Sequence, residues 1–93
     1  MNASVQTNVN PPLHIRAHLR IDTQTKVLEF IMALCDGKIT DHFDLENFEA
    51  TQRVNARSLL GVIYATTEFP DNIYLVNTDN DGVFPASIDA FRA

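Results

Sequence analysis

The sequence predicts a two-layer α+β domain with the element order β-α-β-β-α-β-α. Three observations support this fold class. The chain has 93 residues, which is enough for one small domain and too few for two. Its apolar residues change period along the chain, from the alternation typical of half-buried strands to the spacing typical of amphipathic helices. Each predicted helix has one apolar face, which a sheet covered on one side can bury.

Residues 1–12 form a polar segment that is rich in asparagine and ends in Pro11-Pro12. Because such a segment has little apolar surface to bury, we expect a flexible leader. It has neither the charged nor the apolar stretch of a secretory signal. The single folded domain is therefore predicted to span 13–93.

The first strand is predicted over 13–21, where apolar residues alternate with basic ones. The basic side chains are those of His14, Arg16, His18 and Arg20. We expect them to face solvent and to pair with acidic side chains of another strand, with Asp44 and Glu46 as candidates. The alternative is that they bind an anionic partner.

A helix follows, with Asp22 or Thr23 as its N-cap and Gly37 beyond its end. Its apolar stripe consists of Val27, Phe30, Ile31, Leu34 and Cys35. Cys35 has no cysteine or histidine partner at the spacing of a metal or redox site. We therefore expect a buried structural thiol.

A hairpin is predicted next, with strands over 42–46 and 52–56 joined by the polar turn 47–51. Ser58 is placed to cap a second helix, which should end before Phe69-Pro70.

A fourth strand is predicted over 72–77, followed by a turn over 77–82, which is rich in Asn, Asp and Gly. This turn begins like a calcium-binding loop, but its twelfth position is Ile88 in place of the required glutamate. The last element is predicted to be a two-turn helix with Pro85 in its first turn.

Composition and charge disfavour several functions. Seven basic against 12 acidic residues give a net charge of −5, the wrong sign for binding a polyphosphate backbone. No apolar stretch approaches the roughly 20 residues of a membrane span. The single cysteine cannot close an intrachain disulfide. We therefore expect a cytoplasmic protein that binds neither nucleic acid nor membrane.

The sequence contains no paired carboxylates, no nucleophile with a nearby base and no phosphate-binding loop. We therefore expect no enzymatic activity, no cofactor and no metal.

The segment RVNARSLLGVI, residues 53–63, together with the element order, resembles HPr, the histidine-containing phosphocarrier of the sugar phosphotransferase system. The shared pattern is a strand, a basic residue, a serine, two bulky apolar residues, then glycine and valine. The resemblance is most specific over 52–77 and follows the element order over 13–91. It implies an open-faced sandwich, in which three helices cover one face of a four-stranded antiparallel sheet.

The active histidine of the HPr family is missing from its expected place. In HPr a Gly-Leu-His-x-Arg-Pro type of loop joins the first strand to the first helix. Matching Phe30 to the family's apolar position in that helix places Thr23 at the histidine and Thr25 at the arginine. A threonine hydroxyl does not take up phosphate reversibly near neutral pH, as an imidazole does. The resemblance therefore implies a divergent member without phosphocarrier activity.

His14 is the alternative phosphocarrier residue, because Leu13-His14-Ile15-Arg16 contains the family's Leu-His-x-Arg core. This alternative requires a rearranged N-terminus, since the active loop follows a strand and opens a helix. We therefore expect His14 to be a strand residue.

Ser58 corresponds to the regulatory serine of HPr proteins, and it is a candidate phosphorylation site as well as a helix cap. A phosphate there would lie at the positive end of a helix, with Arg57 adjacent. The HPr resemblance also makes Arg57, Leu59, Leu60 and Ile63 candidate partner-docking residues, although packing against the core accounts for part of this apolar set.

The expected function is a non-catalytic regulatory or protein-interaction domain related to the phosphotransferase system. In this respect it resembles the catabolite-repression paralogue of HPr, which lacks the histidine and keeps the serine. Its expected partners are phosphotransferase-system or regulatory proteins, and a homodimer through the edge of the first strand is a further candidate. The alternatives are an active phosphocarrier using His14 and an interaction module of an unrelated assembly that shares the fold.

Overall fold

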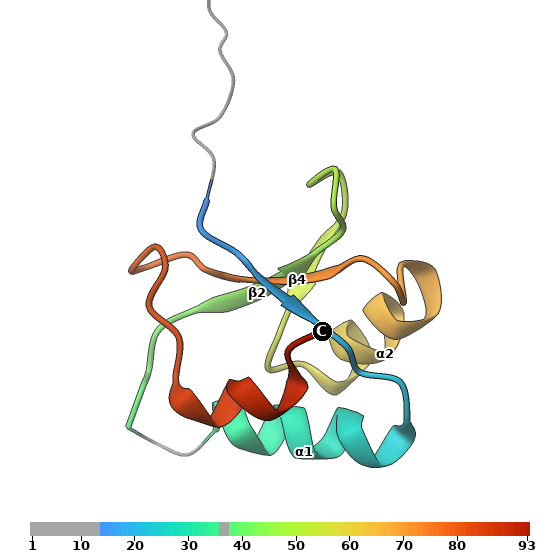
Figure 1. Cartoon of the computed structure of the whole chain (residues 1–93), viewed down its shortest axis with the longest axis horizontal. Helices are drawn as coiled ribbons and strands as arrows, with labels where there is room; N and C mark the ends of the chain where they lie inside the picture. Colours follow the sequence, from blue (N-terminus) through green and yellow to red (C-terminus); the bar gives the residue numbers. More distant parts are fainter. Residues whose placement is uncertain (1–13, 36–37) are drawn as a thin grey trace, which may run out of the picture.

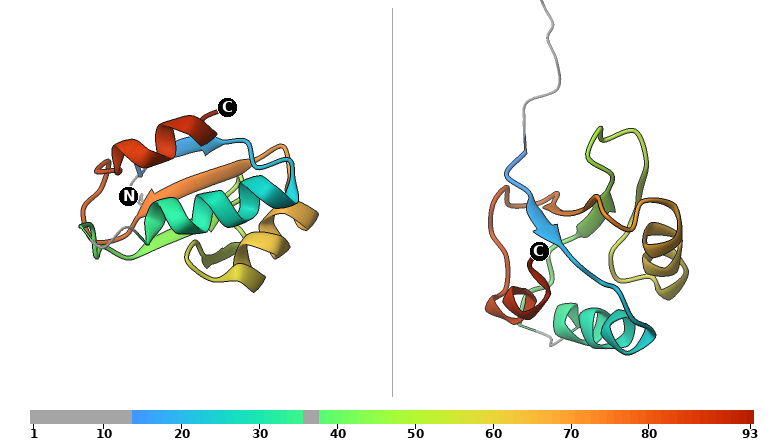
Figure 2. Two further views of the ribbon diagram at one scale, coloured as in Figure 1. Left: turned by 90° about the horizontal axis from the view of Figure 1, so that it is seen from below. Right: turned by 45° about the vertical axis from the view of Figure 1, so that its right-hand side comes forward.

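The computed structural model describes residues 14–35 and 38–93, in which three helices lie on one side of a four-stranded sheet (Figures 1 and 2). The elements are β1 (Ala17–Leu19), α1 (Gln24–Leu34), β2 (Phe43–Glu46), β3 (Arg53–Asn55), α2 (Leu59–Glu68), β4 (Ile73–Asn77) and the 3-10 helix η2 (Ala86–Phe91). All strand pairs are antiparallel, in the order β1-β4-β2-β3. The α+β class is confirmed. The observed order differs from the predicted one in its last element, which is a 3-10 helix and not an α-helix.

β1 is shorter than the predicted strand over 13–21. Only Ala17–Leu19 pairs with β4, and the backbone N–H of Ile15 donates to the Asp81 carboxylate at 3.0 Å. The predicted alternation holds where the strand is paired, because Ala17 and Leu19 are buried. Before that point the chain contacts the turn after β4, and Ile15 is exposed.

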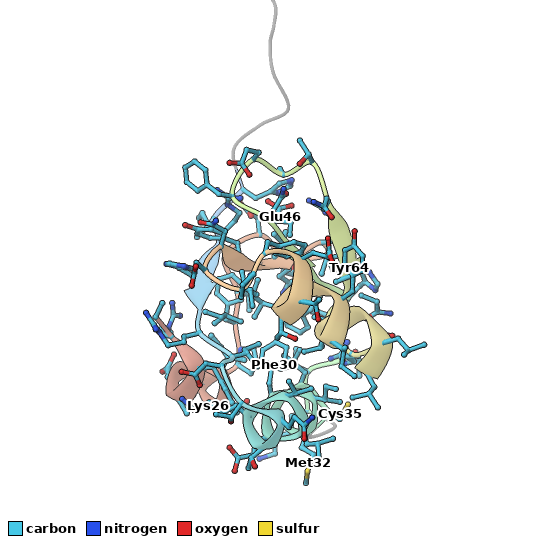
Figure 3. All side chains as sticks on the ribbon, turned by 90° about the vertical axis from the view of Figure 1, so that its right-hand side faces the viewer. Lys26, Phe30, Met32, Cys35, Glu46 and Tyr64 are labelled. Atoms are coloured by element: carbon cyan, nitrogen blue, oxygen red, sulfur yellow. The ribbon has the colours of Figure 1, made fainter. Side chains whose placement is uncertain are left out.

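The core lies between the helices and one face of the sheet. Cross-strand pairing places Leu75 of β4 opposite both Ala17 and Leu45. Phe30 points inward from α1, while Met32 points outward (Figure 3). The rings of Phe30 and Phe91 meet edge to face, with centroids 5.5 Å apart, and so attach η2 to α1.

The expectation of a buried Cys35 is wrong, because this side chain is exposed. α1 ends at Leu34, and Cys35 is its C-cap, with φ −105° and ψ 20°. The residue therefore leaves the helical spacing that would have placed it on the buried stripe. Thr23 is the N-cap, as predicted, and its hydroxyl accepts the N–H of Lys26 at 3.1 Å.

The opposite face of the sheet is covered by polar and aromatic side chains, which we call the outer-face cluster. It consists of Arg16, His18, Asp44, Glu46, Phe48, Arg53 and Tyr74. The Glu46 carboxylate is 2% exposed and accepts hydrogen bonds from Arg16 at 2.9 Å and from Arg53 at 2.5 Å. The predicted pairing of basic residues near β1 with acids of β2 is thus confirmed for Arg16.

Aromatic rings complete the outer-face cluster. The Arg16 guanidinium lies over the Tyr74 ring, 4.3 Å from its centroid, and His18 stacks on the same ring at 4.6 Å. Because these side chains cover the sheet, Asp44 and Glu46 of β2 are buried. Simple alternation predicts a solvated polar side for this strand, and that prediction is wrong.

The segment 77–82 is a turn, as predicted. The Asn77 side chain accepts the N–H groups of Asp79 and Asn80, each at 2.9 Å. The carboxylates of Asp79 and Asp81 accept backbone N–H groups of His42 and Ile15. Within residues 14–35 and 38–93, no three side chains of the metal-ligating types come together.

None of the helices in the described ranges has the length and hydrophobicity that a membrane span requires.

The Glu46 pairs yield a prediction about stability. We expect Glu46→Gln to lower the free energy of unfolding by about 2–3 kcal/mol, because two arginines lose their buried counter-charge while remaining partly exposed. Urea denaturation measures this loss. The matched control is Asp89→Asn, which removes the exposed pair with Arg92 and should cost at most about 0.5 kcal/mol. Equal losses in the two variants would show that the outer-face cluster contributes little to stability.

A second prediction concerns Asp41, which lies in the loop before β2. Hydrogen bonds from the side chains of Asn77 and Asn80, at 2.8 and 3.0 Å, lower the pKa of Asp41 below its ordinary value of 3.8. The nearby charge of Arg57 acts in the same direction, and desolvation acts against it. The ionised carboxylate therefore stabilises the fold above the ordinary pKa, and this stabilisation is lost as the pH falls through the lowered value.

An NMR titration of the Asp41 carboxyl carbon should give a midpoint below 3.8. Asn80→Ala should raise this midpoint, because it removes one donor. Thr78→Ala is the control in the same turn, since its hydroxyl donates to the His42 carbonyl and not to Asp41. A midpoint unchanged by Asn80→Ala would contradict the assigned cause.

Candidate functional site

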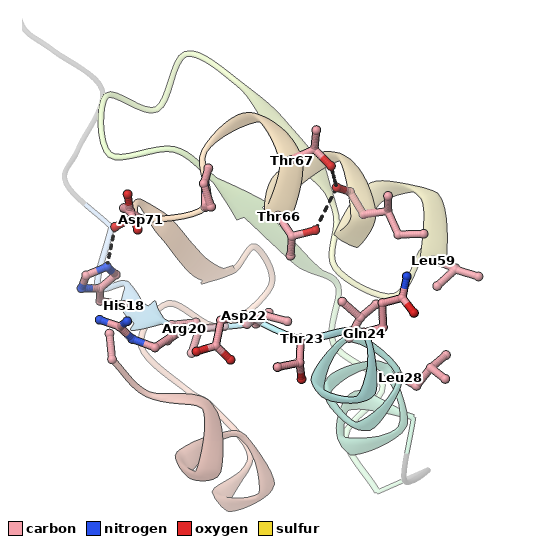
Figure 4. A pocket seen from close by; sticks show the side chains of 16 residues that line it. His18, Arg20, Asp22, Thr23, Gln24, Leu28, Leu59, Thr66, Thr67 and Asp71 are labelled. Carbon is pink, nitrogen blue, oxygen red and sulfur yellow. Dashed lines mark hydrogen bonds between the residues drawn. The ribbon is translucent and has the colours of Figure 1, made fainter.

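A cavity of about 650 Å³ opens between the end of β1, the start of α1 and the face of α2 (Figure 4). Three of the residues predicted from the family resemblance, Thr23, Leu59 and Ile63, line it. Sequence positions that lie more than 30 residues apart therefore meet at one site.

Thr23, at the position of the family's histidine, has its hydroxyl occupied as the cap of α1. Thr25, at the position of the arginine, is exposed and lies outside the cavity lining. The imidazole that does line the cavity belongs to His18, whose Nε2 is 3.2 Å from the Asp71 carbonyl oxygen (Figure 4).

His14 lies before β1, whereas α1 follows the other end of that strand. Its imidazole Nδ1 is 3.6 Å from the Asp81 carboxylate, and its side chain is partly exposed. His14 was predicted to be a strand residue, but it lies outside the paired part of β1. It also lies outside the cavity lining. The structure therefore does not bring His14 to the Thr23 site.

Ser58 caps α2, as predicted, and its hydroxyl accepts the N–H of Gly61 at 3.1 Å. The neighbouring Arg57 side chain binds backbone carbonyls and not Ser58. Its guanidinium donates to the carbonyl oxygens of Leu34 at 3.0 Å, Ile39 at 2.8 Å and Asp41. Arg57 therefore joins the end of α1 to the loop before β2, and in this structure its charge is not directed at Ser58.

α2 exposes four large apolar side chains, Tyr64 and three aliphatic ones, and we call the aliphatic three the α2 patch. They are Leu59, Leu60 and Ile63, with exposed fractions of 47%, 78% and 44%. The buried residues of the helix are Val62 and Ala65. Packing against the core therefore accounts for Val62 and Ala65 and leaves the α2 patch unexplained.

The edge of β1 is occupied by the chain's own last residues. The N–H of Arg20 donates to the carbonyl of Phe91 at 2.7 Å, and the N–H of Ala93 donates to the carbonyl of His18 at 2.9 Å. The predicted homodimer through this edge requires unpaired backbone groups, and the His18 carbonyl and the Arg20 N–H are already paired. A homodimer through this stretch would have to displace 91–93, and the dimer itself stays a prediction.

His18, Arg20, Asp22 and Asp71 lie together at the charged end of the cavity. From the sequence, His18 and Arg20 were predicted only as basic strand residues and Asp22 only as a candidate helix cap, and Asp71 was not singled out. The position of Arg20 and Asp22 at the predicted junction of strand and helix could have indicated them. Asp71 follows α2, and only the fold brings it to His18.

Comparisons of this chain with protein-family models, with curated proteins and with solved structures found no match. The resemblance to HPr therefore depends on the pattern within 53–63 and on the predicted element order. Function has to be argued from the cavity and the α2 patch.

The glycine of the family-like segment yields a further prediction. A Cβ at Gly61 would lie 2.7 Å from the backbone oxygen of Asn55, closer than real contacts allow. We therefore expect Gly61→Ala to destabilise the protein by about 1–3 kcal/mol, although alanine normally favours a helix by about 1 kcal/mol. The control is Thr67→Ala on the exposed part of α2, with an expected change within about 0.5 kcal/mol. Thermal unfolding of both variants checks this, and a stabilised Gly61→Ala would contradict the close approach.

Proposed function

We propose that this protein is a non-catalytic, HPr-like interaction domain of the phosphotransferase system or its regulation, and that it docks protein partners through the α2 patch. The observation that carries the proposal is the exposure of Leu59, Leu60 and Ile63 on a helix whose other face is anchored in the core. Adjacent exposed apolar side chains on a rigid element are typical of protein-binding surfaces.

The proposal excludes a histidine phosphocarrier for reasons of placement. Thr23 uses its hydroxyl to cap α1, and His14 contacts Asp81 away from the cavity. The ring of His18 is stacked on Tyr74 and its Nε2 contacts the Asp71 carbonyl, so that this imidazole is held by the fold. These contacts support a role in binding and not in phosphoryl transfer.

Ser58 is proposed as the regulatory residue of the same surface. Its hydroxyl is half-buried and precedes the α2 patch directly. A phosphate on it would place about −1.5 to −2 charges beside Leu59 and Leu60 and would alter docking there. Because Arg57 is engaged with backbone carbonyls, the N-terminus of α2 would have to accommodate this charge.

Phosphate transfer tests the proposal. The protein is incubated with enzyme I and phosphoenolpyruvate, and separately with the HPr serine kinase and ATP, and any phosphate is located by intact mass and fragmentation. We expect no phosphohistidine and a phosphate on Ser58 from the kinase. Acid-labile phosphate on His14 would make the protein an active carrier and overturn the proposal.

A binding measurement tests the α2 patch. We expect Leu60→Ser to weaken the binding of enzyme I, measured by calorimetry, by about tenfold or more, because a central apolar contact is lost. Met32→Ser is the matched control, since Met32 is an equally exposed apolar residue on the outer side of α1. Equal effects of the two variants would place docking elsewhere. Absence of both binding and phosphorylation would refute the link to the phosphotransferase system.

A further inference from the structure

We propose that the cavity beside α1 and α2 binds a small zwitterion with apolar side chains, namely an apolar amino acid or a short apolar peptide. This inference goes beyond the docking function, because it concerns a free small molecule and the interior of the cavity. A volume of about 650 Å³ lies within the range of small-molecule sites, about 300–1,000 Å³.

One end of the cavity carries large apolar side chains, with the amide of Gln24 beside them. Leu28 of α1 and Leu59 and Ile63 of α2 form its rim, and all three are substantially exposed. Ile21 and Val27 also line the cavity and are buried. An apolar side chain seated here would remove this surface from water, which is the main source of affinity available to a small ligand.

The other end carries charges of both signs. Figure 4 shows His18, Arg20, Asp22 and Asp71 on one side of the cavity and Leu28 and Leu59 on the opposite side. The contact between His18 Nε2 and the Asp71 carbonyl, at 3.2 Å, connects β1 to the segment that follows α2. The cavity is therefore divided into a charged end and an apolar end.

Two of these charged groups have no partner within residues 14–35 and 38–93. Neither the Arg20 guanidinium nor the Asp71 carboxylate makes a hydrogen bond or an ion pair there, whereas Asp22 lies 3.5 Å from Lys26. An unpaired guanidinium suits a carboxylate, and an unpaired carboxylate suits an ammonium group. The ligand is accordingly one that carries both groups.

The balance of charge argues against other ligand classes. One arginine and two aspartates line the cavity, so that a ligand with a single anionic group would meet repulsion as well as attraction. The hydroxyls of Thr66 and Thr67 both donate to the Ile63 carbonyl, at 2.9 and 2.8 Å, and their oxygens stay available as acceptors for N–H groups. A zwitterion with an apolar body satisfies both ends of the cavity.

The test is an amide NMR titration of the full chain with four probes: dileucine, N-acetyl-dileucine, dileucine amide and diglycine. They differ in the ammonium group, the carboxylate and the apolar side chains. We expect dileucine to shift the signals of the cavity residues. The affinity of each of the other three probes should be at least about tenfold lower.

Two pairs of variants locate the binding. Ile63→Ser should weaken dileucine binding several-fold, while Met32→Ser, an exposed apolar residue outside the cavity, should leave it unchanged. Arg20→Gln should remove the preference for dileucine over its amide, because the partner of the carboxylate is gone. Arg92→Gln, which removes an exposed arginine paired with Asp89, should keep that preference.

Three outcomes would overturn the proposal. They are the absence of shifts at cavity residues at about 10 mM dileucine, equal binding of the free and blocked dipeptides, and shifts centred outside the cavity. Each outcome leaves the docking function standing, since that function is measured with enzyme I and with Leu60→Ser.

Discussion

The carboxylate of Glu46 accepts hydrogen bonds from Arg16, beside β1, and from Arg53, on β3. β1 and β3 are the two edges of the sheet, and Glu46 lies on a central strand. One buried carboxylate therefore connects both edges across the face that no helix covers. The Tyr74 ring, which contacts both the His18 ring and the Arg16 guanidinium, extends this cover. This small domain thereby shields the second face of its sheet from water with polar and aromatic side chains, and without a second apolar layer.

The outer-face cluster also bears on the cavity. His18 stacks on Tyr74 on the outer face, and its Nε2 reaches the Asp71 carbonyl at the charged end of the cavity. The adjacent backbone of residues 18–20 is bonded to 91–93. His18 therefore connects the outer-face cluster both to the charged end of the cavity and to the edge of β1.

Short-range chemistry accounts for the parts of this protein that sequence patterns predicted well. Thr23 and Ser58 cap their helices because each hydroxyl needs only the N–H three residues ahead. The α+β class followed from the same local changes of period. The burial of Cys35 was mispredicted, although it too depends on local structure. α1 ends at Leu34, so Cys35 does not continue the buried stripe of the helix.

The α+β class and the starts of α1 and α2 could thus be predicted from the sequence, because each depends on residues within one or two turns. Only the tertiary structure decided that Glu46 would be buried between two arginines and that Arg20 and Asp71 would share one cavity. These partners lie between seven and 51 residues apart in the sequence. Hydrogen bonds and ion pairs act over a few ångströms, so that such contacts exist only after the strands have been brought into register.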